Sequence, residues 1–116
     1  MIIKNADNIA KRANSTLDEF VRAVKIDLFT GVIENTRRDT GRMQGNWQTT
    51  VGSPATGTVP IRSESATVSD MDRKSGGAGD TTYLTNNVPY VGIWEQRDGM
   101  VAKNIARIET NIRKRK

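Results

Sequence analysis

Three carboxylates beside predicted turns, Asp39, Glu95 and Asp98, are the side chains with the clearest potential for chemistry. Acid/base work by paired carboxylates needs two of them in one shaped pocket, where different surroundings separate their pKa values. Nothing in the spacing of these three marks such a pair. A salt bridge from Asp39 or Glu95 to Arg42 is the favoured interpretation, and no catalytic residue is predicted.

The composition removes most other reaction chemistry. The 116 residues include no histidine and no cysteine. The commonest general base, the thiol nucleophile, disulfides and thiolate metal sites are therefore excluded. A magnesium site made of carboxylates alone remains open, but neither a metal nor a cofactor is predicted. The composition favours a protein that is not an enzyme.

The net charge of +5 is concentrated at the C-terminus. From Lys103 onward there are six basic side chains and one acid, whereas the twelve basic and twelve acidic residues before it balance. The candidate phosphate contacts are Arg113, Lys114, Arg115 and Lys116, in a basic end over 113–116. Such contacts are independent of base sequence and sensitive to salt. Basic residues also suit the carbonyl end of a helix dipole, so both interpretations stay open.

The length fits one domain, taken here as 1–116. A domain this small gains stability from oligomerisation. No apolar run approaches the ~20 residues that cross a bilayer, so no membrane contact is predicted. The N-terminus is too short and too polar for a signal peptide, and we expect synthesis in the cytoplasm of a cell.

A long helix is predicted from about Asp7 to Thr36. One face is apolar at helical spacing, and a second apolar row begins halfway along with Ile26, Phe29 and Ile33. Either the helix is clamped between a sheet and another helix of the same chain, or the second row contacts another subunit. About 30 residues would span roughly 45 Å, more than the width of so small a domain, which slightly favours the subunit contact. The first face consists of Ile9, Ala13, Leu17, Phe20, Val24, Leu28 and Val32.

Two short strands are predicted from alternating apolar and polar residues, one from Trp47 to Val51 and one from Thr81 to Thr85. Between them, Ser, Thr, Gly and Pro predict a flexible loop at about 53–80. Within that loop, a weak short helix from Ala66 to Lys74 would end at Gly76. Such a long loop is either a hairpin connection or an arm that becomes ordered on assembly.

A helical turn from Tyr90 to Glu95 and a last helix beginning near Asp98 or Gly99 complete the chain. The last helix has an apolar seam of Val101, Ile105, Ile108 and Ile112. The elements together predict an α+β fold. In it, a long N-terminal helix and a C-terminal helix pack on a small antiparallel sheet.

Two polar segments, which begin at Asp39 and Asn86, carry turn chemistry. Gly41 suits a positive φ, Asp39 can bond nearby backbone groups, and Pro89 ends a strand because it cannot donate a ladder hydrogen bond. These features indicate architecture rather than catalysis. The residues assigned to the turns and their surroundings are Asp39, Thr40, Gly41, Arg42, Asn46, Trp47, Asn86, Asn87, Pro89 and Tyr90.

Aromatic residues in the strands and the following turn predict either a core cluster or a subunit interface. The core is the favoured interpretation for Trp47, whereas for Tyr90 and Trp94 a subunit interface is also considered. The complete set of candidate interface residues is Ile26, Phe29, Ile33, Tyr90, Trp94 and Glu95.

The turn motifs, in their order, resemble the neck or tail-completion family of long-tailed bacteriophages. The Asp-Thr-Gly-Arg segment at 39–42, followed by Gly-Asn-Trp-Gln at 45–48, resembles one segment of that family. The stretch 83–90 resembles a second, with Glu95 at the family's acidic position, and 99–101 resembles the start of its last helix. The likeness covers about residues 15–112. Between Glu95 and Gly99 only three residues intervene, where family members commonly have a longer glycine-containing stretch.

The resemblance implies a structural virion protein at the head–tail junction, made in the host bacterial cytoplasm. It implies a homo-oligomeric ring that contacts other neck or tail proteins, such as a tail terminator, a head-closure protein or an adaptor. Non-specific contact with packaged DNA stays open. A ring needs a heterologous interface that closes. The alternative is an accessory protein that binds nucleic acid non-specifically through its basic C-terminal helix.

Overall fold

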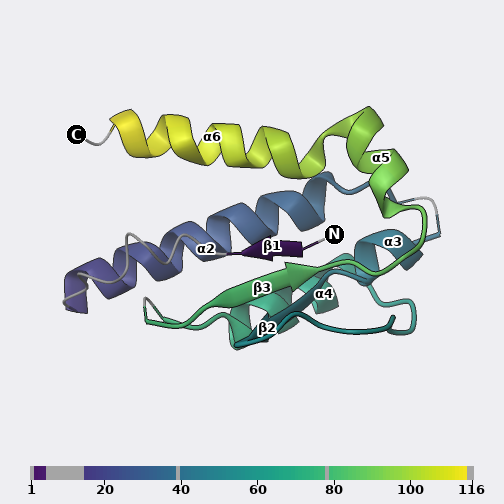
Figure 1. Ribbon diagram of the computed structural model, residues 1–116, viewed down its shortest axis with the longest axis horizontal. Helices are drawn as coiled ribbons and strands as arrows, with labels where there is room; N and C mark the ends of the chain where they lie inside the picture. The colour runs from purple at the N-terminus through teal and green to yellow at the C-terminus, as the bar shows by residue number, and fades with distance from the viewer. Residues whose placement is uncertain (1, 5–14, 39, 78, 115–116) are drawn as a thin grey trace.

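The computed structural model describes residues 2–4, 15–38, 40–77 and 79–114. Figure 1 shows an α+β fold in which α2 (Ser15–Asn35) runs between α6 (Met100–Lys114) and a small sheet. The predicted fold class is thus confirmed, with the C-terminal helix packed on α2. The remaining elements are β1 (Ile2–Lys4), α3 (Arg42–Gly45), β2 (Gln48–Val51), α4 (Glu64–Lys74), β3 (Thr82–Thr85) and α5 (Val91–Asp98).

The helix α2 is enclosed on two sides by its own chain, which decides between the two interpretations of its second apolar row. Phe29 and Ile33 are fully buried in the core, and Ile26 is partly buried against that core. The assignment of Phe29 and Ile33 to a subunit interface is wrong, because both are buried in a core cluster that includes Met71 of α4 and Leu84 of β3. The assignment of Ile26 stays a prediction. The part of the predicted helix before Ser15 lies outside the described residues.

The close approach of α6 to α2 depends on Gly31. A Cβ at this position would lie 2.2 Å from Oδ1 of Asn104, a buried residue on α6. The Asn104 amide donates to Asn35 Oδ1 and to the Met100 carbonyl oxygen. Asn104 therefore occupies the seam position expected for Ile105, which is 38% exposed, so this part of the predicted apolar seam is wrong.

The sheet has the order β1-β3-β2, and both pairings are antiparallel. Leu84 of β3 pairs with Ile3 on one side and Thr49 on the other, and Leu84 and Thr49 are buried. The two predicted strands are confirmed to within one residue at their first positions. The strand β1 was not predicted, because three residues are too few for an alternation pattern.

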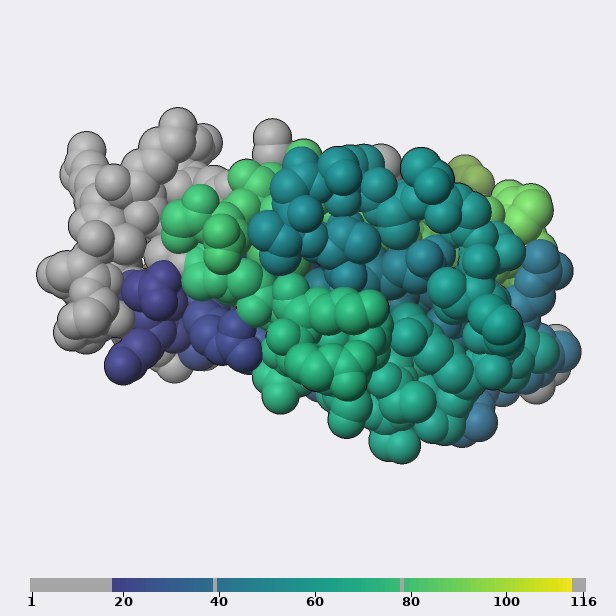
Figure 2. Space-filling view, turned by 90° about the horizontal axis from the view of Figure 1, so that it is seen from below, coloured from purple at the N-terminus to yellow at the C-terminus, as the bar shows by residue number. Residues whose placement is uncertain are grey.

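The connection between β2 and β3 contains a complete helix, α4, and covers much of the face seen in Figure 2. Ser63 caps α4 by accepting a hydrogen bond from the Ala66 N–H. The short helix predicted from Ala66 to Lys74 is therefore confirmed and begins two residues earlier, at Glu64, so the connection is not a loop throughout. The C-cap is Ser75 rather than Gly76, the stop that was predicted.

The segment after α4 is held by a buried cation. Lys25 on α2 is 2% exposed, and its Nζ donates to backbone carbonyl oxygens of Gly76, Gly77 and Asp80. It also donates to Thr82 Oγ1 at 3.2 Å. Burying an ammonium group is tolerated when its N–H donors are matched by acceptors. Lys25 thereby fixes the path of the chain into β3.

Candidate interaction site

The Asp-Thr-Gly-Arg turn builds the start of α3. Gly41 is the N-cap residue of that helix and has a φ of 86°. The positive φ predicted for Gly41 is thus confirmed, and glycine adopts this left-handed conformation readily. Thr40 Oγ1 accepts a hydrogen bond from the Arg42 N–H at 3.2 Å. Asp39 lies outside the described residues. Arg42 itself is exposed.

Asparagine side chains join this turn to the end of β3 and to the loop after β2. The Asn46 amide donates to the Arg42 carbonyl oxygen at 2.7 Å, and its Oδ1 accepts from the Val59 N–H at 2.8 Å. Asn86 donates to the Met43 carbonyl oxygen at 2.8 Å. Buried amides of this kind satisfy backbone groups that would otherwise be unpaired.

Trp47 and Asn87 complete the same cluster. The Trp47 indole N–H donates to Thr36 Oγ1 at 2.7 Å, and the ring is fully buried. Asn87 donates to the carbonyl oxygens of Ala55 and Gly57. The motif segments, which lie about forty residues apart in the sequence, thus meet in one hydrogen-bonded cluster, which we call the motif cluster. Its members are Thr40, Gly41, Arg42, Asn46, Trp47, Asn86 and Asn87.

Glu95 caps α6 and does not pair with Arg42. Its two carboxylate oxygens accept hydrogen bonds from the N–H groups of Val101 (2.9 Å) and Ala102 (3.1 Å). Gly99, with a φ of 62°, makes the sharp turn between α5 and α6 that allows this contact. The predicted salt bridge to Arg42 is wrong for Glu95. Its observed role is that of an N-terminal cap, which favours a carboxylate, and its place in a subunit interface stays a prediction.

Tyr90 and Trp94 lie near the C-terminal end of α2, beside three arginines. Arg37 and Arg97 place their guanidinium carbons 4.3 Å and 5.1 Å from the centroid of the Trp94 ring. Arg42 lies 5.9 Å from the Tyr90 ring centroid. These distances are typical of cation–π contacts.

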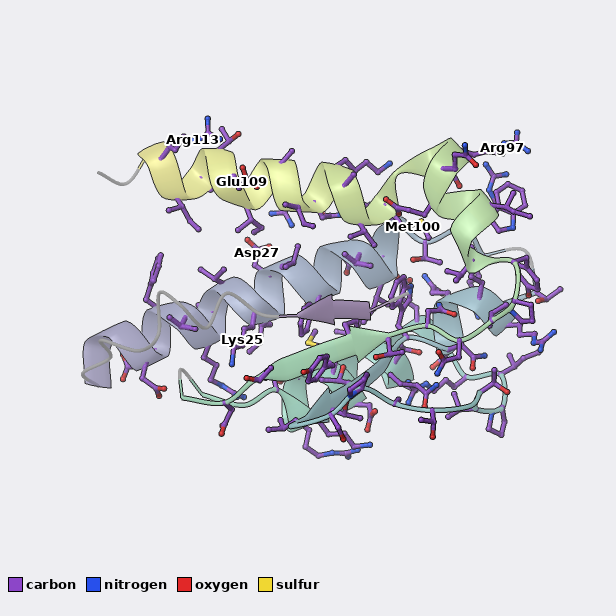
Figure 3. All side chains as sticks on the ribbon, viewed as in Figure 1. Lys25, Asp27, Arg97, Met100, Glu109 and Arg113 are labelled. Atoms are coloured by element: carbon purple, nitrogen blue, oxygen red, sulfur yellow. The ribbon has the colours of Figure 1, made fainter. Side chains whose placement is uncertain are left out.

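Ile93 lies between these aromatics on α5, and its side chain is 62% exposed. Figure 3 labels Arg97 on α5, pointing away from the rest of the molecule. We call this surface the arginine–aromatic end. It consists of Arg37, Arg42, Tyr90, Ile93, Trp94 and Arg97.

The ionic balance of this end is positive. Asp98 accepts two hydrogen bonds from Arg37, at 3.0 and 3.1 Å. The hydrogen bond from Arg37 lowers the pKa of Asp98 below its ordinary value of 3.8. Among the described residues, no ion pair includes Arg42 or Arg97. The guanidinium groups of these two exposed arginines therefore form no salt bridge with a carboxylate of the described residues.

The sequence predicted Tyr90, Trp94 and Arg42, but it did not single out Arg37, Ile93 or Arg97. Arg37 comes from the turn after α2 and the other two come from α5, and only folding places them together. One signal was present in the sequence. Ile93 and Arg97 are three and seven residues after Tyr90, a spacing that puts them on one face of a helix.

The basic C-terminal end is only partly described. Arg113 forms an exposed ion pair with Glu109 at 3.3 Å, one helical turn away. Lys114 is the last residue of α6, and Arg115 and Lys116 lie outside the described residues. The ion pair gives Arg113 a structural partner, and such exposed pairs contribute little to stability.

A groove of about 450 Å³ lies between α2 and α6. Among the described residues that line it, the one acid is Asp27, which pairs with Arg107 of α6 at 3.1 Å. The other described lining residues are uncharged, so this part of the groove shows no pair of groups for acid/base chemistry. The lining residues are Phe20, Ala23, Val24, Asp27, Ile108, Asn111 and Ile112.

Within the described ranges, acidic side chains do not gather in a group of three that could ligate a metal. The helices of that same part of the chain are too short or too polar to cross a membrane. Comparisons with protein-family models, with curated proteins and with solved structures find no match to this chain.

Proposed function

We propose that this protein is a structural subunit of a tailed bacteriophage particle, a neck or tail-completion protein that forms a ring and helps to join head and tail. It is not an enzyme under this proposal. Its partners are further copies of itself and other proteins of the head–tail junction, such as a tail terminator, a head-closure protein or an adaptor.

The motif cluster carries the proposal. The two segments that resemble the phage family are about forty residues apart, yet Asn86 bonds the Met43 carbonyl oxygen within the first of them. Residues that build one cluster depend on one another, so their joint presence is a stronger signal than any motif alone. The motif cluster has a structural role, because its side chains form hydrogen bonds with backbone groups and do not line a pocket for a ligand.

The surroundings of the acidic side chains support a structural role. Glu95 caps a helix, Asp98 is bonded to Arg37 and Asp27 is paired with Arg107. The sequence also has no histidine, the commonest general base, and no cysteine, so thiol nucleophiles are absent as well.

The decisive experiment is electron microscopy of particles assembled without the protein. We expect heads and tails that fail to join, or unstable tails, and rescue by the wild-type chain supplied in trans. The variant Asn86→Ala is expected to rescue poorly, because it removes the amide that links the two motif segments. Asn111→Ala, an exposed position on α6, is the matched control.

Normal, infectious particles in the absence of the protein would contradict the proposal. Truncation after Ile112 addresses the nucleic-acid alternative. If DNA binding is the function, the full chain should bind DNA with a steep salt dependence, and this truncation should abolish that binding. If assembly is the function, joining should survive the truncation.

A further inference from the structure

The arginine–aromatic end has the composition of a protein–protein interface. Trp, Tyr and Arg are enriched at such interfaces and among the residues that contribute most to binding, whereas Lys is depleted. This end contains one Trp, one Tyr and three arginines around Ile93, and no lysine. Its residues come from the turn after α2, from α3, and from α5 with its N-cap Tyr90, so they form a surface only in the folded chain.

The surface is continuous. Arg37 and Tyr90 line one small pocket of about 100 Å³ together with Thr40 and Met43. Arg37 also lies over Trp94, and the ring of Trp94 lies under Arg97. Contacts from Arg37 to Trp94 and from Trp94 to Arg97 thus connect the turn after α2 with α5.

A second exposed isoleucine lies beside the Asp-Thr-Gly-Arg turn. Ile61 is 61% exposed, and its Cγ2 is 3.5 Å from the position of a Cβ built on Gly41. Arg38, from the same turn, lies within 4 Å of that position. This end of the molecule therefore carries two of the large apolar side chains that the described surface exposes.

A nucleic acid fits this surface poorly. Binding of single strands uses open aromatic faces on which bases stack. Two guanidinium groups already lie over the Trp94 ring, and Arg42 lies over Tyr90. A phosphate backbone would also leave Ile61 and Ile93 without an apolar partner.

We infer that the arginine–aromatic end binds a different protein, at a surface where carboxylate side chains surround an apolar patch. Ile93 enters the apolar patch, while Arg42 and Arg97 pair with the carboxylates. An identical surface on a second copy would place arginine against arginine, which like charges disfavour. Any other face of a second copy belongs to a chain with a net charge of +5, so a surface rich in carboxylates is better supplied by a different protein. This inference rests on the proposed function, since it names the chemistry of one of the assembly partners.

Photo-crosslinking in the bacterial cells where the particles assemble tests the inference. Gln96 is exposed on α5 beside Arg97, and replacing it with benzoylphenylalanine puts the reactive group on this surface. The control probe replaces Ala106, which is exposed on α6. Crosslinked peptides are then sequenced to locate the contact in the partner.

We expect the probe at position 96, and not the probe at 106, to crosslink to a different protein at a segment rich in Asp or Glu next to apolar residues. Ile93→Asp and Arg97→Glu should each reduce the yield by about tenfold or more, since each removes a central contact. Ile105→Asp and Arg113→Glu are the matched controls and should leave it unchanged. Changing a contacted carboxylate of the partner to lysine should restore crosslinking to the Arg97→Glu chain.

Several results would overturn the inference: crosslinks to nucleic acid, crosslinks to a second copy of the chain, no crosslink from position 96, or equal yields from all variants. Thermal melting of each purified variant checks that folding is retained. The identity of the partner separates this inference from the proposed function. An acidic, apolar surface on a protein that is not part of the particle would confirm the surface and contradict the assembly role.

Discussion

Lys25 and Arg97 lie toward opposite ends of the molecule in Figure 3, and their charged groups have opposite surroundings. Lys25 is 2% exposed, and its ammonium group donates to backbone carbonyl oxygens of the segment before β3. Arg97 is exposed, with its guanidinium group over Trp94 and no ion pair within the described part of the chain.

The two cations differ in whether their contacts stabilise the fold or remain available for binding. The contacts of Lys25 are internal, so losing them should cost stability. The contacts of Arg97 leave its N–H groups available to a partner, so losing them should cost binding and little stability. Measurements of stability and of binding should therefore separate the two ends.

The largest expected effect is from Lys25→Met, a change that keeps the aliphatic length and removes the ammonium group. It should lower the free energy of unfolding by about 3 kcal/mol, since buried acceptors lose their donor. Urea denaturation measures the loss, and hydrogen exchange should rise at residues 76–82. Lys103→Met, at an exposed position, is the control. Equal stability of the two variants would contradict the internal role of Lys25.

The next effect is from Glu95→Ala, which sharpens the comparison within the arginine–aromatic end. Glu95 follows Trp94 of that end directly in the sequence, but it bonds inward, to the first turn of α6. Loss of this cap should cost about 1 kcal/mol. Amide exchange should rise most at Val101 and Ala102. Glu95→Gln keeps an acceptor oxygen and should lose less, and an unchanged exchange rate in Glu95→Ala would rule out the cap.

A smaller effect on stability is expected from Arg97→Ala. The free energy of unfolding should change by no more than about 0.5 kcal/mol, as for other exposed positions. The fluorescence of Trp94 should become more accessible to acrylamide, because a covering guanidinium group is lost. The buried ring of Trp47 should report no change. A loss of stability as large as that of Lys25→Met would remove the contrast between the two ends.

The smallest effect concerns the acid limb of stability. The Arg37 hydrogen bond lowers the pKa of Asp98 in the folded chain, so its contribution is present above the ordinary value of 3.8. That contribution disappears as the pH falls through the lowered folded value. NMR titration should show the pKa of Asp98 rising toward 3.8 in Arg37→Ala. An unchanged pKa would exclude the Arg37 hydrogen bond as the cause.

Helix and strand positions were largely predictable, because they follow from local periodicity. The position of α6 and those of the strands β2 and β3 follow from the spacing of a few apolar residues, although Asn104 takes the place of Ile105 in the seam of α6. Helix α4 was underestimated because its stability depends on Ser63 as a cap and on Asp70, which is bonded by Arg62 and Lys74. For Asp70, burial raises the pKa, but the hydrogen bonds from Lys74 and Arg62 lower it by more.

The two-sided burial of α2 shows where local reasoning ends. Its second apolar row was visible in the sequence, but a row of Ile26, Phe29 and Ile33 suits a core and a subunit contact equally well. The outcome depended on whether other elements of the same chain reach that face. The position of Asn104 in the seam of α6 was not predictable either. A buried amide there needs hydrogen-bond partners, and the sequence does not reveal that Asn35 and Met100 supply them.

The sequence by itself determined the chemistry that is excluded, the helix and strand periods, and the turn residues Gly41 and Asn86, because these depend on residue type and near neighbours. Only the tertiary structure decided that Lys25 is buried, that Glu95 caps a helix, and that arginines from the turn after α2, from α3 and from α5 share one surface. By its count of charged residues, the chain before Lys103 is neutral, yet part of its folded surface is positive. A surface charge depends on which side chains meet in space, and that is a property of packing rather than of order along the chain.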